Sequence, residues 1–173
     1  MPTEVSNDMP NDMPHYLPNE KLDGESRCLL IVEDDPEDRL LLGGAFRKAG
    51  IDAQIWWVRD GEEMDDYLHG RNQYGGEPPP RPSLILMDLN MPKVNGLEAT
   101  ARIKSNPHLW QIPVVIFTTS AAPEDVQRAY TAGANSYITK PSEFNSLLKF
   151  ACVFTQYWIE IVTLPVASRQ CST

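Results

Sequence analysis

The segment LILMDLNMP, residues 84–92, indicates the fold most directly. Four large apolar residues are followed at once by Asp88, and then by Asn90 and Pro92. A short run that is apolar on both faces is typical of a strand inside a parallel sheet. Because α/β proteins bind ligands beyond the carboxyl ends of such strands, Asp88 is the first candidate for a functional residue.

The rest of the chain repeats this pattern of short apolar runs and helical segments. Further strands are predicted at residues 28–32, 53–58, 113–117 and 136–139. Helices are predicted at residues 36–49, 61–68, 96–105, 123–132 and 142–162, and Asp35 is placed to cap the first of them. Five strands that alternate with five helices predict an α/β fold, with a doubly wound five-stranded parallel sheet covered on both faces.

The length of 173 residues fits one domain with a tail at each end. We expect residues 1–26 to be a disordered extension, because they repeat the tetrapeptide Asn-Asp-Met-Pro and contain few large apolar groups. Residues 27–162 form the predicted domain, and residues 163–173 form a C-terminal tail. The residues after Pro141 suffice for one long helix and this tail, so we expect no output domain there.

The composition excludes several classes of protein. A net charge of −9 without a basic stripe argues against nucleic-acid binding. No apolar run is long enough to cross a membrane, and the acidic, proline-containing start does not resemble a signal peptide. Cys28, Cys152 and Cys171 are far apart and lack metal-ligand spacing. We expect a cytoplasmic protein that binds neither nucleic acid nor membrane.

Polar side chains come directly after four of the five predicted strands. They are Glu33, Asp34 and Asp35 after the first strand, Asp88 after the third, Thr118 and Thr119 after the fourth, and Lys140 after the fifth. Each alone has an ordinary explanation, such as a helix cap or a solvated loop acid. In a parallel sheet, however, these strand ends meet at one edge, so the set predicts a functional site.

The residue types at this edge indicate a particular chemistry. Neighbouring carboxylates repel one another, and a hard divalent cation such as Mg²⁺ (or Mn²⁺) relieves that repulsion. A carboxylate can attack phosphorus to give an acyl phosphate, while an ammonium and a hydroxyl pair with the phosphoryl oxygens. The pattern therefore favours metal-assisted phosphoryl transfer.

Five motifs in order resemble the receiver domain of two-component response regulators, which has a flavodoxin-like (CheY-like) fold. They are LIVEDD at 30–35, LMDLNMP at 86–92, Gly96, FTTS at 117–120 and YITKP at 137–141, and the likeness covers about residues 27–160. The first acid is Glu33 rather than aspartate, which is a variant within the family.

This resemblance implies a role for each matching residue. Asp88 is the phosphorylated nucleophile, and Glu33 and Asp34 are the acidic pair, with Asp34 the more direct metal ligand. Asn90 gives its backbone carbonyl to the metal. The remaining roles belong to Thr118 as the switch hydroxyl, Lys140 as the partner of a phosphoryl oxygen, and Tyr137 as the switch aromatic. Tyr137 can equally be an ordinary half-buried strand residue. The peptide bond between Lys140 and Pro141 is expected to be cis.

A narrower resemblance points to the small regulators that accompany bacterial phytochromes. It rests on the proline-rich loop that ends at Pro82, on residues 88–92 and on the segment YWIEIVTLP at 157–165. It implies a sensor histidine kinase, of the bacteriophytochrome class, as the phosphoryl donor.

The last predicted helix has more apolar residues than one face needs. One face is formed by Phe144, Leu147, Leu148, Ala151, Phe154, Trp158 and Ile161, while Phe150, Val153, Tyr157 and Ile159 fall elsewhere. Such a helix usually has a partner, which predicts a symmetric homodimer. The alternative is a helix that the C-terminal tail covers.

Two other functions fit parts of the pattern. A Mg²⁺-dependent aspartyl phosphohydrolase would carry an acid–base aspartate two residues after its nucleophile, where this chain has Asn90. A receiver-like binding module that works without phosphorylation would not need Asp88, Thr118 and Lys140 together. We therefore expect a phosphoacceptor with only slow self-dephosphorylation, and not an enzyme with turnover.

Overall fold

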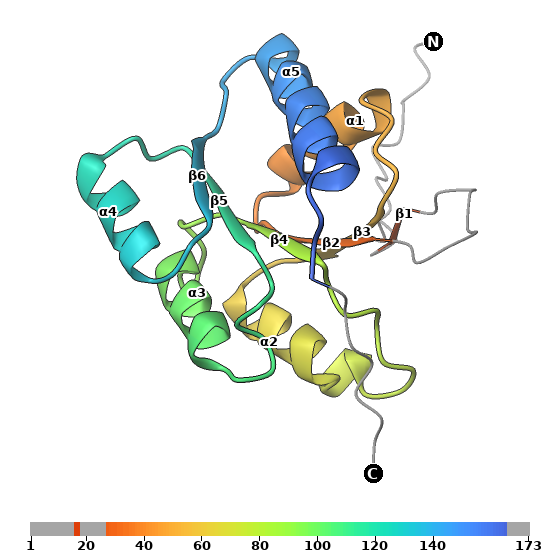
Figure 1. Ribbon diagram of the computed structural model, residues 1–173, viewed down its shortest axis with the longest axis vertical. Helices are drawn as coiled ribbons and strands as arrows, with labels where there is room; N and C mark the ends of the chain where they lie inside the picture. The colour runs from red at the N-terminus through yellow and green to blue at the C-terminus, as the bar shows by residue number, and fades with distance from the viewer. Residues whose placement is uncertain (1–15, 18–26, 166–173) are drawn as a thin grey trace, which may run out of the picture.

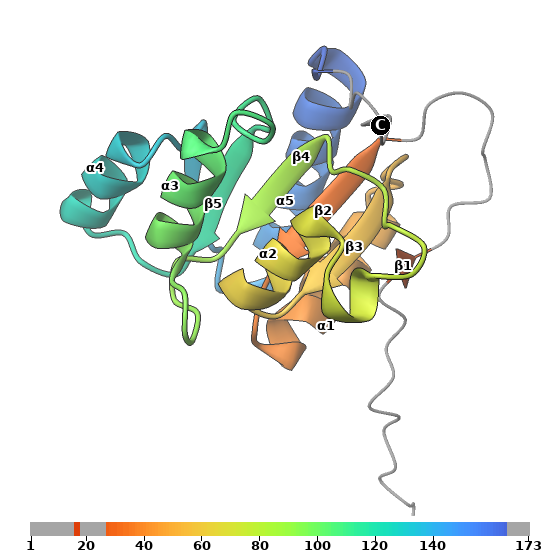
Figure 2. The same cartoon turned by 90° about the horizontal axis from the view of Figure 1, so that it is seen from below.

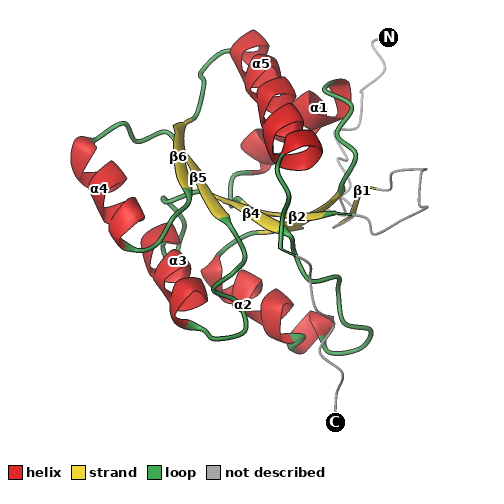
Figure 3. Ribbon diagram, in the orientation of Figure 1, coloured by secondary structure: helices red, strands yellow, loops and turns green. Residues whose placement is uncertain are grey.

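The computed structural model describes Tyr16–Leu17 and residues 27–165. The strands are β1 (Tyr16–Leu17), β2 (Cys28–Val32), β3 (Gln54–Val58), β4 (Leu84–Met87), β5 (Val114–Thr118) and β6 (Ser136–Thr139). The helices are α1 (Pro36–Lys48), α2 (Gly61–His69), α3 (Gly96–Ser105), α4 (Pro123–Thr131) and α5 (Phe144–Phe154), with a 3₁₀ turn η1 (Asn72–Tyr74) and a π-helix η2 (Thr155–Ile161). Figure 3 shows how they alternate along the chain, and the predicted α/β fold is confirmed.

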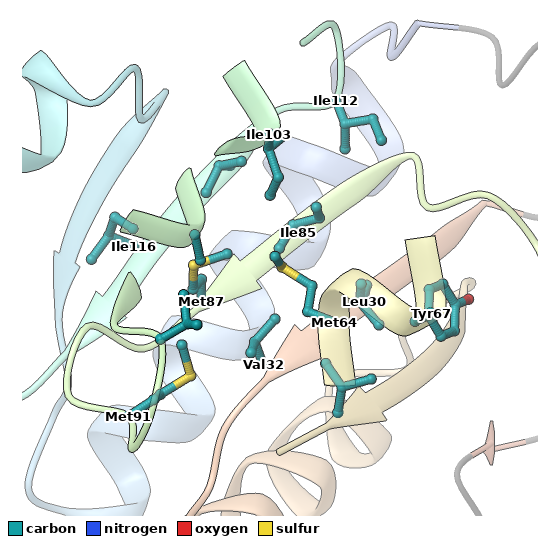
Figure 4. Packing of buried hydrophobic residues seen from close by; sticks show 14 of the residues in the cluster. Leu30, Val32, Met64, Tyr67, Ile85, Met87, Met91, Ile103, Ile112 and Ile116 are labelled. Atoms are coloured by element: carbon teal, nitrogen blue, oxygen red, sulfur yellow. The ribbon is translucent and has the colours of Figure 1, made fainter. Parts of the chain in front are cut away.

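The sheet lies between two layers of helices (Figure 1). Helices α1 and α5 cover one face, and α2, α3 and α4 cover the other. Successive residues of a strand point to opposite faces. Leu30 therefore packs into the core beneath α2 and α3 (Figure 4), while Ile31 packs into the core beneath α1 and α5. No helix in the described part of the chain is long and apolar enough to cross a membrane.

The sheet order places the candidate site. The strands are ordered β1-β3-β2-β4-β5-β6, and β2 to β6 are parallel. The chain first builds outward from β2 to β3 and then returns to add β4 on the other side of β2. Figure 2 shows β2 and β4 running side by side in the same direction. Ligand sites of such sheets lie at this reversal, beyond the carboxyl ends of the two strands.

The N-terminal segment differs from its prediction in one place. Residues 1–26 were expected to be disordered, but Tyr16 and Leu17 pair antiparallel with Trp56 and Ile55 of β3. The edge of β3 offers unpaired backbone groups, and a short strand can satisfy them. The other residues of the extension, and residues 166–173 of the predicted tail, lie outside the described residues.

The last predicted helix, residues 142–162, is two elements. The α-helix α5 ends at Phe154, and the π-helix η2 continues to Ile161. A π-helix has a wider turn than an α-helix, which rotates the side chains that come after it begins. Ile159 is consequently buried, although it was predicted outside the core face, and Ile161 is 66% exposed, although it was predicted within that face.

Candidate functional site

Backbone hydrogen bonds fix the main candidates at the carboxyl edge of the sheet. The backbone N–H of Glu33 donates to the last carbonyl of β3 at 3.0 Å, and that of Asp88 to the last carbonyl of β2 at 3.0 Å. The N–H of Lys140 donates to the last carbonyl of β5 at 2.7 Å. These bonds continue the sheet beyond its strands, so the three side chains start from a rigid backbone.

Three carboxylates meet at this edge. Glu33, Asp34 and Asp88 each offer one oxygen, and these oxygens all lie within 4.8 Å of one another. Glu33 and Asp88 are buried, whereas Asp34 is exposed. A group of oxygen ligands that is open to water on one side suits a hard divalent cation, which keeps some of its own waters. The residues present therefore fit Mg²⁺ or Mn²⁺.

The ammonium of Lys140 lies among the carboxylates. Its Nζ donates to Glu33 Oε2 at 2.6 Å, to Asp38 Oδ2 at 2.8 Å and to Asp88 Oδ2 at 3.0 Å. An ammonium has three N–H donors, so each of them has a carboxylate partner. Burial by itself would lower the pKa of Lys140, but the hydrogen bonds to Asp38 and Glu33 raise it above its usual range, and the side chain stays charged.

Sequence reasoning missed Asp38. Asp38 belongs to the first turn of α1, and its own N–H donates to the capping carboxylate of Asp35 at 3.1 Å. The cap on α1 was predicted correctly, and it places the first turn of the helix at the edge of the sheet. This position in the first turn was the clue that the sequence offered for Asp38, because an acid in this turn can reach the same site.

Burial also governs Glu33. Its side chain is almost without solvent contact, and this desolvation raises the pKa of Glu33 to about 7. The nearby Asp88 raises the pKa further, while the hydrogen bonds from Lys140 and from the backbone of Asp35 act in the opposite direction. Near neutral pH, a proton and a cation therefore compete for Glu33.

Asn90 and Thr118 complete one side of the site. The backbone N–H of Asn90 donates to Asp88 Oδ1 at 3.2 Å, and its side-chain amide donates to the hydroxyl of Thr118 at 3.4 Å. Thr118 is fully buried at the end of β5. The loop after β4 is thus linked to β5 at the point where the predicted switch hydroxyl lies.

Tyr137 is joined to the loop that comes after β5. Its ring is half-buried on β6, and its hydroxyl donates to the carbonyl of Ser120 at 2.9 Å. The half-buried strand position is therefore confirmed, and the switching role stays a prediction.

Close packing behind Asp88 requires a glycine. A Cβ on Gly96 would overlap the carbonyl oxygen of Asp88 and the Cα of Leu89. Gly96 is the first residue of α3, whose preceding residue Asn95 accepts a hydrogen bond from Glu98 N–H at 3.0 Å. The start of α3 therefore supports the loop that carries Asp88.

A comparison with known protein families decides the classification. The model of the response regulator receiver domain matches residues 29–151. This chain belongs to the response regulator receiver family. It is 40% identical over 141 residues to the response regulator Rcp1 of Synechocystis sp., an alignment that covers 82% of this chain and 95% of Rcp1.

Solved structures agree with this assignment. The Mn²⁺-bound form of Rcp1 has a TM-score of 0.74 at 38% identity and covers 81% of this receiver and 99% of that chain. The phosphorylated cyanobacterial phytochrome response regulator RcpA has a TM-score of 0.75 at 35% identity. The match covers 82% of this receiver and 100% of that chain. The bacteriophytochrome response regulator AtBRR has a TM-score of 0.64 at 38% identity. The match covers 75% of this receiver and 91% of that chain. The predicted likeness to phytochrome-associated regulators is confirmed.

One expectation drawn from the family is wrong for this receiver. The peptide bond between Lys140 and Pro141 was expected to be cis, but the described residues contain no cis peptide bond. The trans form is the lower-energy isomer even before proline.

Proposed function

We propose that this receiver accepts a phosphoryl group from a histidine kinase onto Asp88. The observation that carries the proposal is the buried carboxylate of Asp88, 3.0 Å from the Lys140 ammonium and grouped with Glu33 and Asp34. An oxygen of Asp88 bonds to phosphorus while the bond from phosphorus to the kinase histidine breaks, and the electron pair of that bond returns to the imidazole.

The side chains around Asp88 have distinct tasks in this step. Glu33, Asp34, Asp88 and the backbone carbonyl of Asn90 would hold a divalent cation, Mg²⁺ or Mn²⁺, which supplies charge neutralisation when bound. Lys140 turns one N–H from Asp88 to a phosphoryl oxygen. Thr118 donates its hydroxyl to another phosphoryl oxygen, and the movement reaches Tyr137 through the loop that contains Ser120.

Slow hydrolysis rather than turnover is expected from the residue at position 90. An aspartyl phosphohydrolase needs a carboxyl group there to activate water, and an amide cannot take up the proton. The chain therefore acts as a phosphoacceptor that signals by contact with other proteins.

Phosphorylation by acetyl phosphate tests this function. Intact mass after incubation with acetyl phosphate and Mg²⁺ should show one added phosphoryl group in the wild type and none in Asp88→Asn. Asp52→Asn, which changes an exposed aspartate, should be phosphorylated like the wild type. Phosphorylation of Asp88→Asn to the same extent, or an adduct that forms equally without metal, would refute the proposed site.

The names of two relatives suggest the donor. RcpA is a cyanobacterial phytochrome response regulator and AtBRR a bacteriophytochrome response regulator. We infer that a phytochrome histidine kinase phosphorylates this receiver in the cytoplasm. An autophosphorylated phytochrome kinase should transfer its label to the receiver faster than a histidine kinase of another sensor class. Equal rates would argue against this pairing.

We also propose that the receiver forms a homodimer through α5 and η2. Val153, Tyr157 and Ile161 are 58%, 52% and 66% exposed, which leaves an apolar strip along this region. The alternative, in which the C-terminal tail covers this helix, is partly realised as well, because Leu164 of the tail packs against the core beneath α5. The strip itself stays exposed and can be covered by the same strip of a second copy.

Sedimentation at micromolar concentration tests the dimer. Val153→Asp should weaken association at least about tenfold, because a charge would be buried without a partner. Leu40→Asp, which changes another exposed apolar residue, on α1 and 51% exposed, should leave association unchanged. A wild type that sediments as a monomer would refute the proposal.

A further inference from the structure

Asp38 differs from the other two carboxylates that hold Lys140. Glu33 and Asp88 belong to the group of oxygens that fits a divalent cation, and Asp38 does not. Asp38 is also 42% exposed, whereas the side chains of Glu33 and Asp88 are 3% and 9% exposed. One of the three partners of the ammonium therefore lies outside the metal-binding group.

This difference between Asp38 and the two buried carboxylates matters once the site holds a cation and a phosphoryl group. A bound cation would share the charge of Glu33 and Asp88 with Lys140. Phosphorylation converts the Asp88 carboxylate into an acyl phosphate, whose negative charge lies on the phosphoryl oxygens and no longer on the carboxyl group. Both buried partners of Lys140 are then weakened. Asp38 alone among the three keeps its full charge for the ammonium.

The backbone supports Asp38 in this position. Its N–H is held by the cap of α1, and the N–H of Asp35, the capping residue, donates to Glu33 Oε1 at 3.1 Å. A carboxylate in the first helical turn is further favoured by the helix dipole. Asp38 thus connects a fixed helix start to the loop that comes after β6.

We propose that Asp38 is a positioning residue that anchors the Lys140 ammonium to α1 and directs its freed N–H at the phosphoryl group. This inference rests on the proposed phosphorylation of Asp88. A carboxylate also competes with a phosphoryl oxygen for the same ammonium. Anchoring prevails here because the ammonium has three donors, and Asp38 occupies only one of them.

Beryllofluoride, which mimics the phosphoryl group of an acyl phosphate, provides the test. Its affinity is measured by calorimetry on the full chain at saturating Mg²⁺. Asp38→Ala should bind it about tenfold more weakly, the usual result of losing a charge-assisted hydrogen bond. Asp38→Asn should weaken binding less than Asp38→Ala, because the amide oxygen still accepts from Lys140 although the charge is lost. Asp38→Ser, whose side chain is too short to reach, gives a second truncation.

A spectroscopic measurement separates positioning from a general loss of structure. The side-chain ammonium of Lys140 should give a ¹⁵N–¹H signal in the wild type and in Asp38→Asn, because three hydrogen bonds slow its exchange with water. The signal should be lost in Asp38→Ala, while Mg²⁺ affinity stays within about threefold in all variants, since Asp38 is outside the metal group.

The outcomes distinguish the two proposals. A wild type that does not bind beryllofluoride with Mg²⁺ would overturn the proposed function and this inference together. A wild type that binds, with Asp38→Ala binding equally well or more tightly, would overturn the role of Asp38 alone.

Discussion

The carboxyl edge of the sheet and the last helical region are stabilised in opposite ways. At the edge, Lys140 holds three carboxylates together, two of them buried, by charged hydrogen bonds of 2.6–3.0 Å. Along α5, Phe150 stacks on Phe117 with ring centroids 4.4 Å apart, and Phe154 packs against Phe46. The edge therefore depends on charge balance, pH and metal, whereas the helix depends on which way each apolar side chain points.

Removal of the Lys140 ammonium from the edge should have the largest effect on stability. Lys140→Ala leaves buried Glu33 and Asp88 without their common partner, and should lower the free energy of unfolding of the metal-free protein by about 3–5 kcal/mol. Mg²⁺ should restore part of this loss, because it neutralises the same carboxylates. Urea unfolding with and without Mg²⁺ measures both effects.

A matched lysine provides the control. Lys149→Ala on the exposed side of α5 should change stability by less than about 0.5 kcal/mol, with no response to Mg²⁺ beyond that of the wild type. If Lys140→Ala proved as stable as Lys149→Ala, the edge would not depend on charge balance.

A pair of isoleucines tests the helical region. Ile159 is 5% exposed and Ile161 is 66% exposed, although the two residues are only two positions apart. Ile159→Ala should lower the free energy of unfolding by about 2–4 kcal/mol, and Ile161→Ala by less than about 0.5 kcal/mol. The reverse order in urea unfolding would mean that the region continues as an ordinary α-helix.

Per pH unit, the change in stability should be smaller than the effect of Lys140→Ala or Ile159→Ala, and it should be specific to the edge. Burial raises the pKa of Glu33 from 4.5 to about 7, so in this range the folded protein holds a proton that the unfolded chain releases. The free energy of unfolding of the metal-free protein should therefore fall as the pH rises from 4.5 to 7, by a slope approaching about 1 kcal/mol per pH unit.

Glu33→Gln isolates this contribution. The variant cannot bind the proton. Its unfolding free energy should therefore rise relative to that of the wild type as the pH increases across the same range. The helical variants Ile159→Ala and Ile161→Ala should keep the pH dependence of the wild type. Parallel pH curves for Glu33→Gln and the wild type would show that Glu33 does not titrate there.

The two regions also differ in how far the sequence predicts them. Glu33, Asp88 and Lys140 could be placed because each comes directly after a strand, and the strand ends of a parallel sheet meet at one edge. For Asp38, the sequence shows only that it lies in the first turn of α1. Its contact with Lys140 depends on how that helix lies against the edge, which no local pattern contains. Ile159 and Ile161 exchanged their predicted environments because helical periodicity assumes a constant turn, and η2 has a wider one.

Chemical mapping of the phosphorylated residue tests the central claim most directly. The receiver is phosphorylated by acetyl phosphate with Mg²⁺, reduced with borohydride, which converts an aspartyl phosphate to homoserine, and sequenced by fragment mass spectrometry. Phosphotransfer to Asp88 predicts homoserine at position 88 and nowhere else. Homoserine at position 34 or 38, or a phosphorylated chain without reduction at position 88, would contradict it.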